Sequence, residues 1–137
     1  MKKTILFFAA VASLLIGILI YYAFRNLDIQ LLRWLNIHIN NAPSPVHQTP
    51  VSSFLIYNLP DGLWLLSGVL FIRALWISNP AAGSIYIFVF CFLAVFIEGF
   101  QYFNLVPGTF DPADIITMVF VAFGEGMFYR CFIQRRI

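Results

Sequence analysis

The sequence predicts an all-α, polytopic membrane protein: an antiparallel bundle of four transmembrane helices, with a short interfacial helix after the first span. Of its 137 residues, 61% are apolar types and only 10% are charged, whereas charged types make up roughly 25% of an ordinary soluble domain. A soluble chain with so few charges would expose large apolar patches. Four apolar runs, about 4–24, 59–77, 84–102 and 111–130, each approach the length of a membrane-spanning helix. We therefore expect residues 1–137 to form a single transmembrane domain and exclude a soluble enzyme.

The first run extends from Thr4 to Phe24 and follows Met1-Lys2-Lys3. A secretory signal peptide is the alternative interpretation of a basic start followed by an apolar stretch. The run is longer than a usual signal core, and it ends in Tyr21-Tyr22-Ala23-Phe24. An aromatic ending is typical of the membrane interface and not of a small-residue cleavage site, which favours a retained helix.

A polar segment, 25–53, follows the first span. Its part from Leu27 to Ile39 mixes Leu, Ile and Trp with charged residues, so it is too polar to span and predicts a helix lying in the interface. From Asn40 to Pro50 the turn-forming residues predict a loop. His38 and His47 fall in this segment, and we interpret them as solvated loop histidines. The alternative is that they bind a metal together with the acids, but nothing in their spacing indicates it.

The remaining spans are separated by short links. The second helix either begins at Pro60 or is a longer helix that kinks there, and we favour a beginning because proline is well tolerated in a first turn. Residues 78–83 predict a tight connection, and 103–110 predict the next link. Short links make the second, third and fourth helices antiparallel neighbours.

Basic residues set the expected orientation. An even number of spans puts both chain ends on one side, and positively charged ends favour the cytoplasm. Arg25 and Arg33 reduce this contrast slightly, because they lie in the polar segment. The N- and C-termini are therefore predicted to be cytoplasmic, with 25–53 and 103–110 facing outward. The basic residues at the two ends are Lys2, Lys3, Arg130, Arg135 and Arg136.

Acidic and amide side chains collect where the spans meet the outward side. Each would be costly facing lipid, so each needs a partner, water or a function. Residues three apart on a helix share a face, and the antiparallel order brings these helix ends together. We predict one ligand-binding cluster from the following residues: Asp61, Glu98, Gln101, Asp111 and Asp114.

Helix capping is the alternative for two of these acids. Asp111-Pro112-Ala113-Asp114 has the form of a helix start, where both acids would favour the positive end of the helix dipole. Capping is not available to Glu98, because it precedes a helix C-terminus. Glu98 therefore indicates a partner or a functional role.

A second charged pair is expected near the cytoplasmic side. Arg73 lies about five residues before the end of the second helix, and Glu125 lies about five residues before Arg130, so their depths match. We predict a structural Arg73–Glu125 ion pair, direct or bridged by water. The alternative is that Arg73 snorkels to the headgroups. Gly124 and Gly126 would allow a neighbouring helix to approach closely.

The third and fourth helices carry a family resemblance. Glu98-Gly99-Phe100-Gln101, followed by the stretch from Pro107 to Asp114, resembles the E-x-x-Q and P-G-R-[ST]-x-D-x-x-D motifs of the VanZ-like membrane proteins. The stretch Leu59 to Trp64 matches an earlier helix that carries an Asp near its start. The chain departs from the pattern in running directly from Gly108 to Thr109 without the arginine, and in having Met118 and Val121 at family Asn and Gly positions.

The resemblance implies a multi-pass protein of the bacterial inner (plasma) membrane, acting at the cell envelope. Some members of the family are tied to glycopeptide-antibiotic tolerance, but neither a substrate nor a reaction follows from it. We expect a protein that binds a ligand or lipid headgroup and is not an enzyme, and we assign no catalytic residue.

Two alternatives remain open. In one, the four aspartate and glutamate residues of the cluster hold a divalent cation in an enzyme acting on lipid phosphates. The outward side lacks a basic phosphate clamp, which argues against it. In the other, the chain is a structural or accessory subunit whose glycines Gly17, Gly68, Gly124 and Gly126 contact a partner helix.

The expected partners are membrane lipids and either another membrane protein or a second copy of the chain. No Lys/Arg block exceeds two consecutive residues, so we expect no nucleic-acid partner. We also expect no cofactor and no bound metal. Cys91 and Cys131 fall at different predicted depths, so no disulfide is expected between them.

Overall fold

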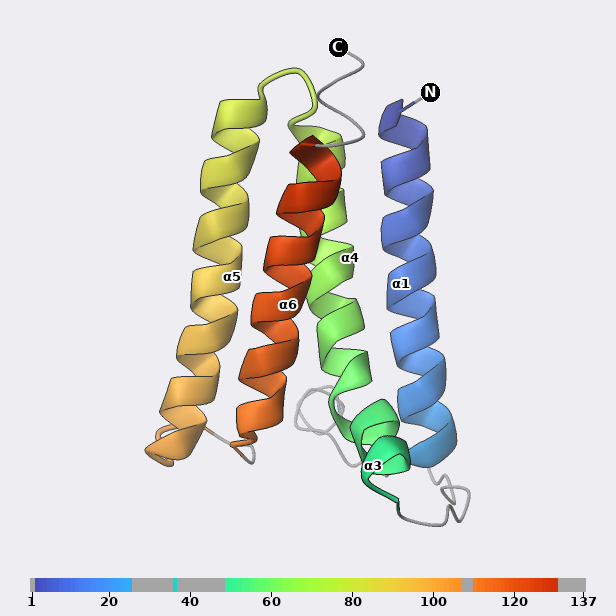
Figure 1. The fold of residues 1–137 in the computed structure, drawn as a ribbon, viewed down its shortest axis with the longest axis vertical. Helices are drawn as coiled ribbons and strands as arrows, with labels where there is room; N and C mark the ends of the chain where they lie inside the picture. Colours follow the sequence, from blue (N-terminus) through green and yellow to red (C-terminus); the bar gives the residue numbers. More distant parts are fainter. Residues whose placement is uncertain (1, 26–35, 37–48, 107–109, 131–137) are drawn as a thin grey trace.

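The computed structural model describes residues 2–25, 36, 49–106 and 110–130, and all of their regular secondary structure is helical, α-helical except for π-helical residues 129–130. Four helices run side by side and alternate in direction, so that the start of α1 and the end of α6 lie at the same end of the bundle (Figure 1). A short helix, α3, lies across the opposite end at an angle to α4 (Figure 1). The helices are α1 (Lys2–Phe24), α3 (Pro50–Tyr57), α4 (Leu59–Leu75), α5 (Pro80–Tyr102) and α6 (Pro112–Phe128).

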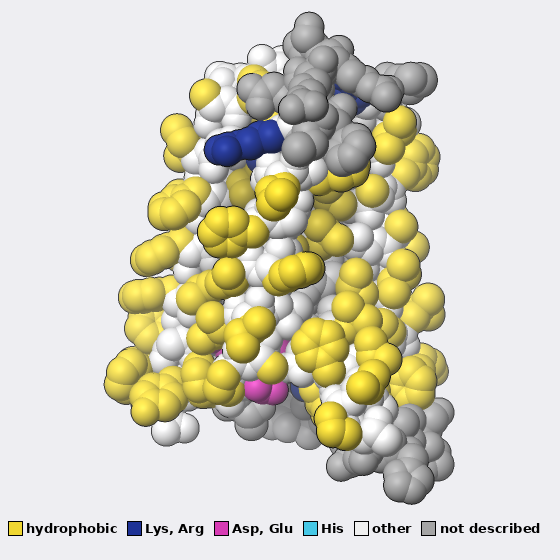
Figure 2. All heavy atoms as spheres, in the orientation of Figure 1, with side chains coloured by type: hydrophobic (Ala, Val, Ile, Leu, Met, Phe, Trp, Pro, Cys, Tyr) yellow, Lys and Arg dark blue, Asp and Glu magenta, His cyan; other side chains and the backbone are white. Residues whose placement is uncertain are grey.

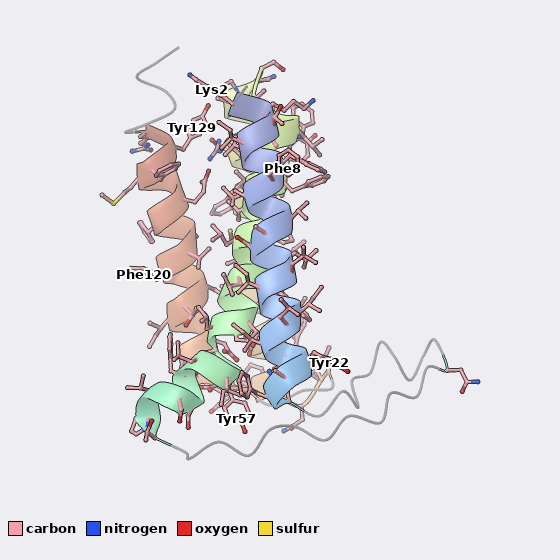
Figure 3. All side chains as sticks on the ribbon, turned by 90° about the vertical axis from the view of Figure 1, so that its right-hand side faces the viewer. Lys2, Phe8, Tyr22, Tyr57, Phe120 and Tyr129 are labelled. Carbon is pink, nitrogen blue, oxygen red and sulfur yellow. The ribbon has the colours of Figure 1, made fainter. Side chains whose placement is uncertain are left out.

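The described part of the chain contains three helical stretches long and apolar enough to cross a membrane: Lys2–Phe24, Pro50–Leu75 and Pro80–Tyr102. The middle stretch joins α3 and α4. Large apolar side chains cover the outside of the bundle, and Phe8 and Phe120 point away from it (Figure 3). By helix length and hydropathy the chain is therefore a multi-pass membrane protein. Helix α6 has 17 residues and a length of about 25 Å, somewhat less than the roughly 30 Å of a hydrocarbon core.

Helix α4 is the centre of the bundle, because α1, α3, α5 and α6 all pack against it. One apolar cluster, in which Leu70 and Ala74 take part, joins α4 to α1 and to Tyr129. A second cluster joins Leu65 and Val69 of α4 to Ile87 and Met118. The polar side chains of α4 are consequently held at fixed positions between its neighbours.

Glycines set the closest helix contacts. A Cβ atom at Gly62 would lie 2.5 Å from Cγ2 of Thr117, and one at Gly17 would lie 2.7 Å from Cδ1 of Trp64. A Cβ at Gly124 or Gly126 would have no neighbour within 4 Å. The predicted close approach of a helix beside Glu125 is therefore wrong within the described chain, whereas Gly17 and Gly62 bring α1 and α6 onto α4.

Helix starts differ from the sequence prediction in two places. Helix α5 begins at Pro80 and not at Ser84, because the Asn79 side chain accepts a hydrogen bond from the Ala82 N–H at 3.2 Å and proline opens the first turn. The predicted loop ends at Pro50, but Pro50 and residues 51–53 of the polar segment belong to α3, which Thr49 and Ser52 cap reciprocally.

The second span combines the two interpretations. Helix α4 begins at Leu59 with Pro60 in its first turn, as favoured, but α3 leads directly into it through Asn58, so Pro50–Leu75 is a longer stretch interrupted near Pro60. The predicted interfacial helix of residues 27–39 lies outside the described residues, as do His38, His47 and Cys131. Cys91 is a free cysteine.

Candidate functional site

Buried charged side chains gather at two opposite ends of the bundle. Figure 2 shows acidic side chains near the lower end and the most prominent basic side chain near the upper end, with hydrophobic side chains between them. We call the lower group the acidic site and the upper group the ion-pair site. The acidic site comprises Arg25, Asn58, Asp61, Glu98, Asp111 and Asp114, and the ion-pair site comprises Arg73, Ser84, Glu125 and Tyr129.

Asp111 both caps α6 and reaches another helix. Its Oδ1 accepts a hydrogen bond from the Ala113 N–H at 2.9 Å, which satisfies a donor that the helix start leaves without an intrahelical partner. Its Oδ2 accepts a second hydrogen bond from the Asn58 amide, also at 2.9 Å. Asp111 therefore does more than cap α6, because it also connects α6 to Asn58.

Asp114 lies one turn further along α6 and is 8% exposed. Its Oδ1 accepts a hydrogen bond from the Asn58 Nδ2 at 2.8 Å, and its backbone N–H donates to the Asp111 carbonyl at 3.0 Å. The side-chain amide of Asn58 thus bridges the two aspartates of α6 from the junction of α3 and α4. An amide nitrogen has two N–H donors, and these two bonds use both.

Asn58 is the residue that sequence reasoning missed. It is 5% exposed and occupies the N-cap position of α4, but its side chain makes no capping hydrogen bond there. The amide is consequently available to α6. The sequence feature that could have identified it is a single polar residue between Tyr57 and Leu59-Pro60, at the same expected depth in the membrane as Asp111.

The other predicted acids join the same site. Glu98 on α5 is 8% exposed and interacts electrostatically with Asp61, Asp111 and Asp114. Asp61, in the first turn of α4, is half-buried and interacts with Asp114 and Arg25. Gln101 is half-buried, one turn beyond Glu98 on α5. Helices α4, α5 and α6 therefore each bring at least one carboxylate to this end of the bundle.

Arg25 supplies positive charge from the end of α1. Its guanidinium carbon lies 4.3 Å from the ring centroid of Tyr21 and 5.5 Å from that of Tyr57, and it interacts electrostatically with Asp61 and Asp114. The sequence prediction used Arg25 only as a topology signal. Arg25 thus interacts with two of the four carboxylic side chains of the described acidic site, in which acidic side chains outnumber basic ones.

The ion-pair site contrasts with this arrangement. The Arg73 Nε lies 2.9 Å from Glu125 Oε1 and Nη2 lies 3.2 Å from Oε2, with side chains only 5% and 4% exposed. Nη1 donates to the Ser84 hydroxyl at 3.2 Å, and the guanidinium carbon lies 4.0 Å from the Tyr129 ring centroid. This is the direct pair that the matching depths predict, with bidentate geometry that balances the two charges.

The chemistry of the acidic site is that of hydrogen-bond acceptance and negative charge. Carboxylate oxygens accept hydrogen bonds and attract ammonium or guanidinium groups. Within the described residues, no three or more His, Cys, Asp or Glu side chains are grouped so that they could hold a metal ion. The site is accordingly suited to a ligand that donates hydrogen bonds or carries positive charge.

The helices and their buried charges define a multi-pass integral membrane protein with a polar group at each end. No family model, curated protein or solved structure matches the chain.

Proposed function

We propose that this chain is a four-span protein of the bacterial plasma membrane whose acidic site binds a cationic or polyhydroxylated headgroup at the outer face. Helix α6 runs beside α4 and α5, which supports its role as the fourth span (Figure 1). Lys2 and Arg130 belong to the end where α1 begins and α6 finishes. The preference of basic residues for the cytoplasm then directs the acidic site outward.

The observation that carries the proposal is the bridging of Asp111 and Asp114 by Asn58 beside the buried Glu98. A carboxylate buried near others is unfavourable unless positive charge or hydrogen-bond donors offset its desolvation. The Asn58 amide and Arg25 offset part of this cost. A ligand ammonium group, or several hydroxyl groups, would offset the rest, so that ligand binding gains from charges the fold already holds in place.

The resemblance to VanZ-like proteins enters this proposal as an expected phenotype. Its matching positions, Asp61, Glu98, Gln101, Asp111 and Asp114, are the acidic and amide side chains at this end of the bundle. We therefore propose that the chain contributes to glycopeptide-antibiotic tolerance through this site. The binding inference itself rests on the contacts of the site and not on family membership.

Isosteric substitutions test the site. Glu98→Gln and Asp114→Asn remove one negative charge each while keeping side-chain size. Lys2→Gln is the control, because it removes a charge at the opposite end of the bundle. We expect the first two variants to bind a short lysine-containing peptide about tenfold more weakly than the unmodified chain in detergent, as measured by calorimetry. The control should bind equally well. An uncharged oligosaccharide, tested in parallel, separates charge recognition from hydroxyl recognition.

Tolerance of cells to teicoplanin-type antibiotics is the cellular measurement. We expect the Glu98→Gln and Asp114→Asn variants to lower tolerance at equal expression, and Lys2→Gln to leave it unchanged. If neither probe binds the unmodified chain and both site variants keep full tolerance, the proposed function is wrong.

One observation favours a second candidate, an accessory subunit of a membrane complex. Gly124 and Gly126 have open space beside them on α6, which a partner helix would fill. Gly124→Leu would block such a contact, and its effect on co-purification of a stable partner tests this candidate. The divalent-metal enzyme has no comparable observation in its favour among the described residues.

A further inference from the structure

A cleft of about 360 Å³ lies beside the ion-pair site, between α5 and α6. It forms because α5 and α6 each pack more closely against α4 than against one another. Its walls are largely apolar, and Phe88, Phe123 and Met127 belong both to the lining and to the exposed surface of the bundle. The volume and the mostly apolar lining with a few polar groups are typical of a small-molecule site.

Polar groups gather at one part of this cleft. Arg73, Ser84, Glu125 and Arg130 all contribute to its lining. Two arginines against one carboxylate give the lining a net charge of +1. Arg73 and Glu125 neutralise each other, and Arg130, which is exposed, carries the remaining positive charge.

Arg73 also keeps hydrogen-bonding capacity. Its bonds to Glu125 and Ser84 use three N–H groups, whereas a guanidinium has five. The cleft thus combines apolar walls with a cationic group and hydrogen-bond donors. That combination complements an amphiphile with an anionic head.

We propose that this cleft binds an anionic phospholipid, with its phosphate at Arg130 and Arg73 and an acyl chain between α5 and α6. Basic pockets between transmembrane helices are suited to anionic headgroups on the cytoplasmic side, which is the side that the proposed topology gives to Arg130. The lipid would fill the space between the two helices, where hydrocarbon contacts replace the missing helix–helix packing. This site is separate from the acidic site, which lies at the other end of the bundle.

Gly126 provides a direct test, because it lines the cleft and a Cβ atom there would meet no atom within 4 Å. Gly126→Leu should therefore fill the cleft without disturbing the fold. Gly124→Leu is the matched control, since Gly124 lies on the same helix, is equally unobstructed and does not line the cleft. Arg130→Gln tests the charge, and Lys2→Gln, on α1 at the far side of α4 from α5, is its control (Figure 1).

The measurement is native mass spectrometry of the full chain in mild detergent, titrated with phosphatidylglycerol or with phosphatidylcholine. We expect phosphatidylglycerol to be retained about fivefold better, the factor for one arginine near the membrane surface. Gly126→Leu should abolish retention and Arg130→Gln should remove the preference, while both controls behave as the unmodified chain does.

Equal retention of the two lipids by the unmodified chain would overturn the proposal, as would full retention by Gly126→Leu. A dimer that Gly126→Leu dissociates would also overturn it, because a second copy of the chain would then occupy the cleft.

Discussion

At the end of the bundle where α4 finishes, Arg73 and Glu125 form a buried bidentate pair whose charges cancel. At the end where α4 begins, the Asn58 amide bonds Asp111 and Asp114, and Arg25 interacts with Asp61 and Asp114. A fourth carboxyl group, that of Glu98, interacts with these three aspartates. Both groups use α4 and α6, and both lie in the same apolar bundle. The ion-pair site contains a complementary partner for its buried carboxylate, whereas the acidic site retains negative charge that a ligand can match. The comparison indicates that the buried charges of the ion-pair site stabilise the fold, whereas those of the acidic site are suited to binding a ligand.

The largest effect is expected from breaking the ion-pair site. Glu125→Leu leaves the Arg73 guanidinium buried without its carboxylate, which should destabilise the fold by about 3–5 kcal/mol. The double variant Arg73→Met with Glu125→Leu should recover most of this loss, because no charge then remains buried. Thermal unfolding in mild detergent, followed by circular dichroism, measures both. A stable Glu125→Leu protein would mean that Arg73 reaches the headgroups instead.

A smaller effect is expected from separating the helices that build the acidic site. Gly62→Ala would place a Cβ 2.5 Å from Cγ2 of Thr117, so α4 and α6 must move apart, at a cost of about 1–3 kcal/mol. Gly124→Ala is the matched control, since its Cβ would meet nothing within 4 Å. The midpoint of thermal unfolding should fall for the first variant only. Equal midpoints would show that Thr117 yields without moving the helix.

Asn58 tests whether the acidic site is held together by its amide. Asn58→Leu removes both donors to Asp111 and Asp114 and should cost about 1–3 kcal/mol, since a buried acceptor and a half-buried one lose this partner. Asn58→Gln keeps the amide on a longer side chain and should lose less. We also expect ligand binding to fall in Asn58→Leu, because the two carboxylates are no longer fixed. Unchanged stability and binding would show that the bridge has no role.

The smallest effect separates the two roles of Asp111. Asp111→Ser keeps a capping oxygen for the Ala113 N–H but lacks the second oxygen that reaches Asn58, whereas Asp111→Ala loses both. Asp111→Ala should be less stable than Asp111→Ser by about 1 kcal/mol, the usual value of an N-cap. Both variants should bind the lysine-containing peptide less well. If the two variants have the same unfolding midpoint, the cap contributes nothing measurable.

Local chemistry explains which features of these two sites were predictable. Asp111-Pro112 predicts a helix start, because N-capping by aspartate and the preference of proline for the first turn both act within one turn of the chain. Arg73 and Glu125 were paired by depth alone, since matching positions along antiparallel helices restrict the possible partners. The start of α5 is less predictable, because proline is common both in turns and in the first turn of a helix, and only the Asn79 cap distinguishes the two.

Other features depend on contacts between segments distant in sequence. Asn58 lies 53 residues from Asp111, and nothing in its neighbours indicates that its amide turns away from its own helix. The role of Arg25 likewise depends on where α1 ends beside α3 and α4. Gly124 and Gly126 look like helix-contact residues, but the position of α5 leaves them open.

Hydropathy, helix length and capping are properties of short stretches of chain, so the amino-acid sequence alone places this protein in a membrane and locates its long helices approximately. Which end of the bundle balances its charges, and which does not, depends on the folded arrangement. That outcome depends on how α4 is rotated against α5 and α6, and this rotation is fixed by side-chain packing and close glycine contacts between distant segments.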